Sequence, residues 1–273
     1  MKTQLPRGIM IVSVIISLLV VLASVAGLLY SGTYQFETEN WRRQAQGQDI
    51  GNLFAVMLLL GSAYGVGRKS FRSCLIWVGT LFYLLYAYLI YAVALHFGNL
   101  FLLYVTILGL VIYSLIFWFL TTAFQKNTTV YPKARVLTFS AYVLITTGVL
   151  FALLWLSEII PSLMSGTVPK SLIEAGLIVN PVHVIDLSTV LPGMIVTGIL
   201  ALKARPTGLY FVVPWLVFTV LMGISVVVAM IIIATAGGVS TAAPMITISS
   251  LVLVALGALY YFAKNINSRP SPR

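Results

Sequence analysis

The sequence predicts an all-α membrane protein, a polytopic bundle of about eight membrane-spanning helices. Of its 273 residues, 60% are hydrophobic and only 8% are charged, and the mean hydropathy is +1.04. In soluble domains about a quarter of the residues are charged, so this composition is typical of a chain that faces lipid. Eight apolar stretches also come close to the length of about 20 residues that crosses a hydrocarbon core.

The eight stretches follow one another along the chain and define the expected helices. The first stretch is longer than the apolar core of a secretory signal, so we interpret it as a retained membrane helix. The expected helices cover residues 8–30, 50–67, 73–96, 99–122, 135–157, 181–202, 208–236 and 244–263. Residues 1–273 are therefore expected to form a single integral membrane domain, in which the two long links, 31–49 and 158–180, make a small extracytoplasmic cap.

The basic residues predict how the protein is oriented in the membrane. All of the 16 Lys and Arg residues except Arg42, Arg43 and Lys170 fall at the helix ends on the side of the two termini. Short cytoplasmic loops retain Lys and Arg during insertion, so both termini are expected in the cytoplasm and the protein in the cell membrane. The formal charge of +10 then anchors the chain to lipid headgroups, and we expect no nucleic-acid partner.

The sixth expected helix begins with the segment that is richest in chemistry. Asn180 is a good N-cap residue and Pro181 suits the first helical position. His183 and Asp186, three residues apart, project from one side of this helix, and Asp186 lies about 9 Å below the cap. An ionisable side chain at this depth needs a partner and marks a functional site, so Asp186 is the expected anchor of a ligand.

Other polar residues are expected at the same level of the membrane, at the ends of other helices. Asp49 begins the second helix, Glu158 ends the fifth, and His96 and Asn99 lie at the turn between the third and the fourth. Together with Tyr91 they complete the set of candidate ligand-binding residues around Asp186, provided that the bundle places these helix ends side by side.

The third expected helix is rich in aromatic residues. At about 100° per residue, Tyr83, Tyr86 and Tyr91 fall on one broad side of the helix. Buried tyrosine hydroxyls need hydrogen-bond partners. The sequence therefore predicts either a polar seam formed by these hydroxyls or ordinary aromatic packing between helices.

Three classes of function remain open for the outer polar residues. They could bind a small polar or cationic solute for sensing or transport. Alternatively, His183, Asp186 and Glu158 could hold a divalent cation such as Zn²⁺ or Mn²⁺ in a membrane-embedded hydrolase that acts on a lipid or lipid-linked substrate. As a third reading, His183 and Asp186 only fix helix packing in a scaffold protein. The sequence contains no Walker A, HExxH or GxSxG motif, which favours a role other than enzymatic, and it implies no other cofactor.

Small residues in the second helix and prolines in later helices indicate special packing. Gly61 and Gly65 form a GxxxG pair, which we assign first to packing within the chain and second to a homo-oligomer contact. Pro192 and Pro214 permit kinks, which transporters use to expose backbone near the membrane midplane.

Four polar segments carry a resemblance to a known family: Gly47-Gln48-Asp49, residues 99–104, Trp155-Leu156-Ser157-Glu158, and residues 180–187 followed by Leu191-Pro192-Gly193. In these segments the chain resembles a family of uncharacterised prokaryotic multipass membrane proteins with eight helices. The resemblance extends from the second to the seventh helix. It implies an integral membrane protein and assigns no activity and no catalytic residue.

Overall fold

The computed structural model describes residues 5–122, 128–130, 133–236, 242–266 and 268–270. Among these residues, eight helical segments are long and apolar enough to cross a membrane, so the predicted fold class is confirmed. Seven of them are α1 (Leu5–Leu29), α2 (Glu39–Gly67), α3 (Phe71–Ala94), α4 (Phe101–Thr122), α5 (Ala134–Ser165), α9 (Pro206–Thr235) and α10 (Ala242–Asn265).

The eighth segment is a single membrane helix with an irregular turn inside it. It consists of α7 (Pro181–Ile185), the π-helical turn η1 (Asp186–Val190) and α8 (Leu191–Leu202). The remaining elements are the short helix α6 (Lys170–Ala175) and two paired antiparallel strands, β1 (Thr128–Val130) and β2 (Ser268–Pro270).

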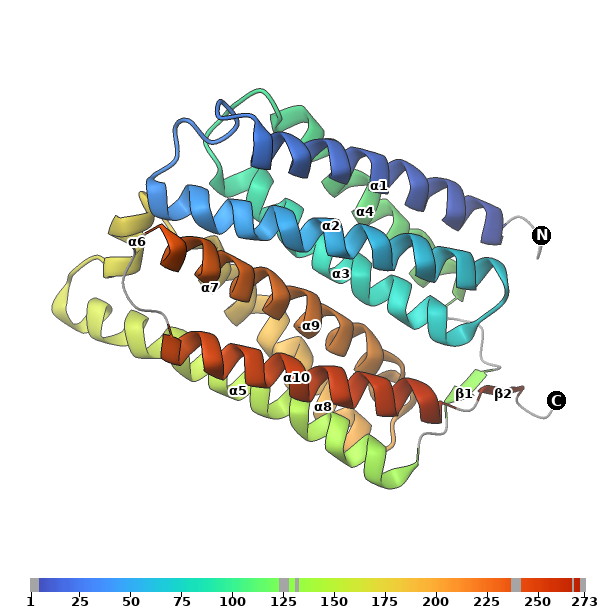
Figure 1. Ribbon diagram of the computed structural model, residues 1–273. Coiled ribbons are helices and arrows are strands. Elements are labelled where there is room, and N and C mark those ends of the chain that lie inside the picture. The colour runs from blue at the N-terminus through green and yellow to red at the C-terminus, as the bar shows by residue number, and fades with distance from the viewer. Residues whose placement is uncertain (1–4, 123–127, 131–132, 237–241, 267, 271–273) are drawn as a thin grey trace.

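The long helices run alongside one another, so the molecule has two distinct ends (Figure 1). We call the end that carries the start of α1, the end of α10 and the two strands the terminal end, and the end that carries α6 the distal end. Helix α1 packs against α2 and α4, and α5 packs against α8 and α10. Helix α9 joins the two halves because it contacts α2 and α3 on one side and α8 and α10 on the other.

Two helix boundaries differ from the expected ones by more than three residues. Helix α2 begins at Glu39 instead of residue 50, because the Thr38 hydroxyl caps it by accepting a 3.3 Å hydrogen bond from the Trp41 N–H. Helix α5 continues through Pro161 to Ser165 instead of ending at residue 157. Much of the expected cap is therefore helical. The two links still meet, because the Thr38 hydroxyl donates a 3.1 Å hydrogen bond to the Ala175 carbonyl.

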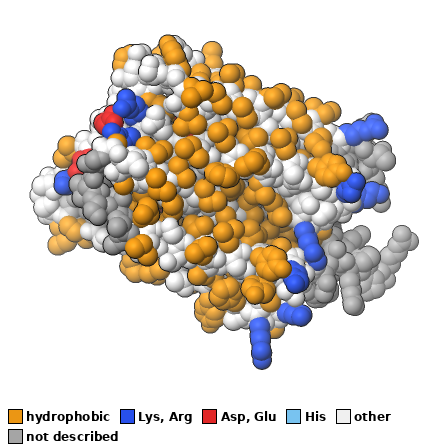
Figure 2. All heavy atoms as spheres, viewed as in Figure 1, with side chains coloured by type: hydrophobic (Ala, Val, Ile, Leu, Met, Phe, Trp, Pro, Cys, Tyr) orange, Lys and Arg blue, Asp and Glu red, His pale blue; other side chains and the backbone are white. Residues whose placement is uncertain are grey.

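The surface has the polarity of a membrane protein (Figure 2). Hydrophobic side chains cover the visible face between the two ends, whereas Lys and Arg side chains gather at the terminal end and a small mixed group of charges lies at the distal end. Leu18, Leu102 and Leu150 are 66%, 74% and 54% exposed. Large apolar side chains in such positions are stable when they contact lipid.

Close packing between α2 and α9 depends on two glycines of α2 that were not expected to have a packing role. A Cβ atom at Gly47 would lie 2.6 Å from the Ala229 nitrogen, and one at Gly51 would lie 2.8 Å from the Ser225 Cβ, so both glycines face α9. Small residues four apart let two helix backbones approach closely. Gly61 and Gly65 form the GxxxG pair that the sequence predicted. Gly65 packs within the chain, because a Cβ there would overlap with Ser73, whereas a Cβ at Gly61 would meet no described atom within 4 Å.

Candidate functional site

The candidate site is a cavity of about 470 Å³ lined by residues of α2, α3, α5, α9, α10 and the α7 to α8 segment. Trp41, Ile233 and Pro244 line it close to the distal ends of their helices, and Met194 and Phe218 line it near the middle of the bundle. The cavity therefore occupies the distal half of the bundle. Its volume lies within the range of about 300–1,000 Å³ that is typical of small-molecule sites.

Asp186 lies on the wall of this cavity. The residue is only 8% exposed, and its Oδ2 accepts a 2.8 Å hydrogen bond from the indole Nε1 of Trp155 on α5. The hydroxyl of Tyr86, which also lines the cavity, lies beside the same carboxylate. The predicted buried anion thus has neighbours from two other membrane helices.

The π-helical turn determines where Asp186 is placed. The Leu191 N–H donates to the Asp186 carbonyl five residues earlier, instead of to the carbonyl four residues earlier as in an α-helix. Pro192 follows directly and has no N–H to give to the preceding turn. The sequence indicated a kink here, and the structure shows a widened turn. Such turns occur frequently at functional sites.

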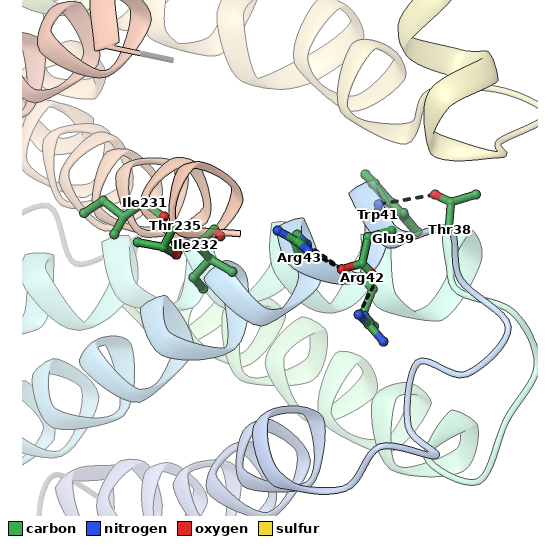
Figure 3. A network of polar contacts seen from close by, with 8 residues as sticks. All are labelled: Thr38, Glu39, Trp41, Arg42, Arg43, Ile231, Ile232 and Thr235. Atoms are coloured by element: carbon green, nitrogen blue, oxygen red, sulfur yellow. Dashed lines mark hydrogen bonds and ion pairs between the residues drawn. The ribbon is translucent and has the colours of Figure 1, made fainter. Parts of the chain in front are cut away.

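The basic residues at the distal end do not neutralise Asp186. Figure 3 shows that Arg42 and Arg43 both turn towards Glu39 at the start of α2, and both form ion pairs with it. Lys170 pairs with Glu174 at 3.4 Å. Within the described ranges, no Lys or Arg forms an ion pair with Asp186. Asp186 is therefore a buried carboxylate that no Lys or Arg of the described residues pairs with.

A row of side chains connects Asp186 to the distal surface. The rings of Trp155 and His183 lie 4.7 Å apart at an angle of 41°. His183 Nε2 is 3.8 Å from Glu158 Oε2, and Glu158 Oε1 accepts a 3.2 Å hydrogen bond from the Ser171 N–H. The side chains of His183 and Glu158 are 9% and 32% exposed, so exposure increases along the row towards the distal end.

This arrangement does not form a metal site from His183, Asp186 and Glu158. His183 approaches Glu158, whereas the Asp186 carboxylate is held by Trp155. In the part of the chain that the structure describes, no three His, Cys, Asp or Glu side chains lie close enough together to hold a metal ion.

Asn180 has the predicted capping role. Its side-chain oxygen accepts hydrogen bonds from the N–H groups of Val182, at 2.9 Å, and His183, at 3.4 Å. Pro181 occupies the first turn as expected. The cap fixes the start of the helix that carries His183 and Asp186.

Asp49 belongs to a separate cluster. It is fully buried on α2, where its Oδ2 accepts a 2.7 Å hydrogen bond from the Tyr34 hydroxyl and its Oδ1 a 3.0 Å bond from the Tyr91 hydroxyl. Burial, and after it the charge of Asp49, raise the pKa of Tyr34 well above its usual value. This hydroxyl therefore stays protonated and can donate its hydrogen bond to Asp49. Asp49 does not line the cavity, although Tyr91 does. Asp49 is therefore not brought together with Asp186 in one site.

His96 and Asn99 also lie apart from Asp186. The backbone N–H of His96 lies 2.7 Å from one oxygen of Glu37 and donates to it, and the His96 Nδ1 lies 3.0 Å from the other oxygen. This pair joins the α1 to α2 link to the α3 to α4 link, in which Asn99 is exposed. These two residues are surface groups of the distal end.

Both readings of the α3 tyrosines describe part of the structure, because their hydroxyls have polar partners while Tyr86 and Tyr91 also pack against the rings of Phe218 and Tyr88. The Tyr83 hydroxyl accepts a 2.7 Å hydrogen bond from Gln48 Nε2 and lies 2.7 Å from Ser225 Oγ. Tyr86 lies beside Asp186, and Tyr91 donates to Asp49. All three hydroxyls thus meet polar partners from α2, α9 or η1.

Several residues of the site were missed from the sequence. Trp155 is the direct partner of Asp186, but in the sequence it stood out only within the segment Trp155-Leu156-Ser157-Glu158 that carries the family resemblance, and it was not a site candidate. Trp41, Gln44 and Gln48 also line the cavity, but they were expected in a link because α2 was expected to start later.

The fold and the site together define a polytopic α-helical membrane protein with a ligand-sized cavity and a buried carboxylate on the cavity wall. Comparison with protein-family models, curated proteins and solved structures finds no match to the chain.

Proposed function

We propose that this protein binds a small polar or cationic solute in the distal cavity, for sensing or transport, with Asp186 as the anchoring charge. The observation that carries the proposal is the Asp186 carboxylate on the wall of a 470 Å³ cavity, where no described Lys or Arg pairs with it. An ionisable group inside a membrane bundle is costly unless it meets a partner, and a bound cation supplies one.

A second polar group on the cavity wall supports ligand binding. Thr147 of α5 is 4% exposed, and its hydroxyl has no hydrogen-bond partner among the described residues. Buried hydroxyls are nearly always paired, with water or ligand when not with protein. The wall of the cavity thus combines one charged group with a buried hydroxyl that has no protein partner among the described residues.

The proposed orientation places the cavity on the extracytoplasmic side of the cell membrane. The Lys and Arg side chains that gather at the terminal end support this orientation, because basic residues are retained in cytoplasmic loops (Figure 2). Transport is supported by the interrupted membrane helix, whose π-helical turn lies at Asp186 itself. Broken helices line the substrate sites of many transporters.

Thiol modification tests access to the cavity. Cys74 is the only cysteine, so the Cys74→Ser chain gives a clean background for Thr147→Cys inside the cavity. We measure the ratio of two rates, that of the cationic reagent trimethylammonioethyl methanethiosulfonate over that of the anionic sulfonatoethyl reagent. We expect this ratio to be about tenfold higher at Thr147→Cys than at the exposed control Thr167→Cys. Asp186→Asn should bring the two rates together. A Thr147→Cys thiol that does not react, or reacts without charge preference, contradicts the proposal.

Two further cysteines test the orientation in intact cells. Thr167→Cys lies in the link after α5 at the distal end, and Lys203→Cys lies in the link after α8 at the terminal end; both positions are exposed. A membrane-impermeant reagent should label the first and spare the second until the cells are opened. The reverse pattern would place the cavity on the cytoplasmic side.

A further inference from the structure

We infer that the occupant of the distal cavity is an amphiphilic organic cation: an ammonium-type centre attached to an apolar body. This inference rests on the proposed function and names the chemical class of its ligand. Three properties of the cavity wall support it: its apolar character, its aromatic side chains and the sign of its charge.

The cavity wall is mostly apolar. Aliphatic side chains from five of the lining segments contribute to it, including Ile90, Leu154, Val190, Met222 and Leu251. A strongly hydrated ion or a sugar would give up many hydrogen bonds to water here without replacing them. An organic body of similar polarity to the wall gains from leaving water.

Aromatic rings stand near the carboxylate. Trp155 and Tyr86 flank Asp186, and Trp41, Tyr91 and Phe218 also line the cavity. The faces of such rings attract organic cations, and Trp attracts them most strongly. The hydrogen bond from Trp155 also fixes the position of the carboxylate, so charge and aromatic surface are presented together.

The charge on the wall determines the sign of the ligand. Within the described part of the chain, Asp186 is the only charged residue that lines the cavity. The remaining polar groups are neutral amides and hydroxyls, among them Gln44, Gln48 and Thr219. A fatty acid or another anionic amphiphile would meet a like charge and no basic residue. A cation is attracted to Asp186 and replaces the missing partner.

A pair of ligands matched in shape tests this inference. Benzyltrimethylammonium and neopentylbenzene differ only in the replacement of the positive nitrogen by carbon. Binding is measured as protection of Thr147→Cys, in the Cys74→Ser background, from the neutral reagent methyl methanethiosulfonate. We expect the cation to protect at a concentration at least about tenfold lower than its neutral analogue. Equal protection by the two compounds would overturn the inference.

Two matched variants assign the preference to Asp186. Asp186→Asn should abolish the preference for the cation, whereas Glu174→Gln, an exposed acid at the same end of the molecule, should preserve it. A preference that persists in Asp186→Asn contradicts the inference. If Asp186→Asn does not fold, Trp155→Phe replaces it. This variant keeps the carboxylate but removes its donor, and a several-fold smaller preference is expected; an unchanged preference counts against the inference.

Tetramethylammonium separates the inference from the proposed function. It carries the same charged centre without the apolar body, so we expect protection only at much higher concentration. If it protects as well as benzyltrimethylammonium, the apolar body contributes nothing and the inference fails, while the proposed cation site stands. If neither cation protects and the Thr147→Cys rates show no charge preference, both fail.

Discussion

Gly27 of α1 and Asp49 of α2 pack so closely that a Cβ atom at position 27 would overlap with Oδ2 of the carboxylate. Tyr34 and Tyr91 donate to the same carboxylate from two other segments. Asp49 is therefore enclosed by protein and joins α1, α2 and α3, whereas Asp186 faces a cavity. The two buried acids of the bundle have different surroundings, and we expect them to have different roles.

Replacing Gly27 with Ala should destabilise the protein. The new methyl group would overlap with Asp49 and lie 2.6 Å from the Tyr34 hydroxyl, and overpacking of this kind costs about 1–3 kcal/mol. Gly109→Ala on α4 is the control, because a Cβ there would meet no described atom within 4 Å. Thermal unfolding in detergent compares the two. Equal midpoints for the two variants would show that α1 does not pack on Asp49.

Tyr91→Phe should also lower stability. The Tyr91 hydroxyl lies 2.9 Å from the Ala45 carbonyl and 3.0 Å from Asp49 Oδ1, and loss of a donor to a buried charged group costs about 1–3 kcal/mol. Tyr113→Phe, at a side chain that is 73% exposed, should change the free energy of unfolding by less than about 0.5 kcal/mol. Denaturant titration of purified protein measures both changes in the free energy of unfolding. If Tyr91→Phe changes it as little as the control does, the Tyr91 hydroxyl does not stabilise buried Asp49.

Asn180→Ala should weaken the start of the helix that carries His183 and Asp186. The side-chain oxygen of Asn180 accepts from two backbone N–H groups, and replacing such a cap with Ala costs about 1 kcal/mol. Asn180→Asp keeps the acceptor and should retain most of the stability. The thermal unfolding midpoints of the original protein and the two variants test this. If Asn180→Asp is destabilised as much as Asn180→Ala, the side chain does not act as a helix cap.

Glu39→Gln should slow the entry of cations into the cavity. Glu39 pairs with both Arg42 and Arg43 at the start of α2 and offsets one of their two positive charges, close to cavity-lining Trp41 (Figure 3). Without it the two arginines repel a cation. We expect the cationic reagent to modify Thr147→Cys several-fold more slowly at low ionic strength, and the difference to vanish in about 1 M salt. If the difference in modification rate persists in high salt, Glu39→Gln has changed the structure and not the electrostatic potential at the entrance.

The bundle could be predicted in detail because its helices are determined by local properties. Apolar length and turn-forming links located the eight membrane helices, and Asn180 with Pro181 located the start of α7. The start of α2 was misplaced, because residues 39–49 are polar and charged and look like a link. In the structure they continue the helix, since Thr38 caps it and Gly47 packs against α9.

The sequence by itself determined the membrane class, the number of helices long and apolar enough to span a membrane, and the buried acidic residue at position 186, because these depend on composition and on spacing along one helix. Only the tertiary structure decided which polar groups meet. It separated Asp49 from Asp186, paired His96 with Glu37 and brought Trp155 to Asp186. Contacts between helices depend on how the helices rotate and pack against one another, and no periodicity within a single helix contains that information.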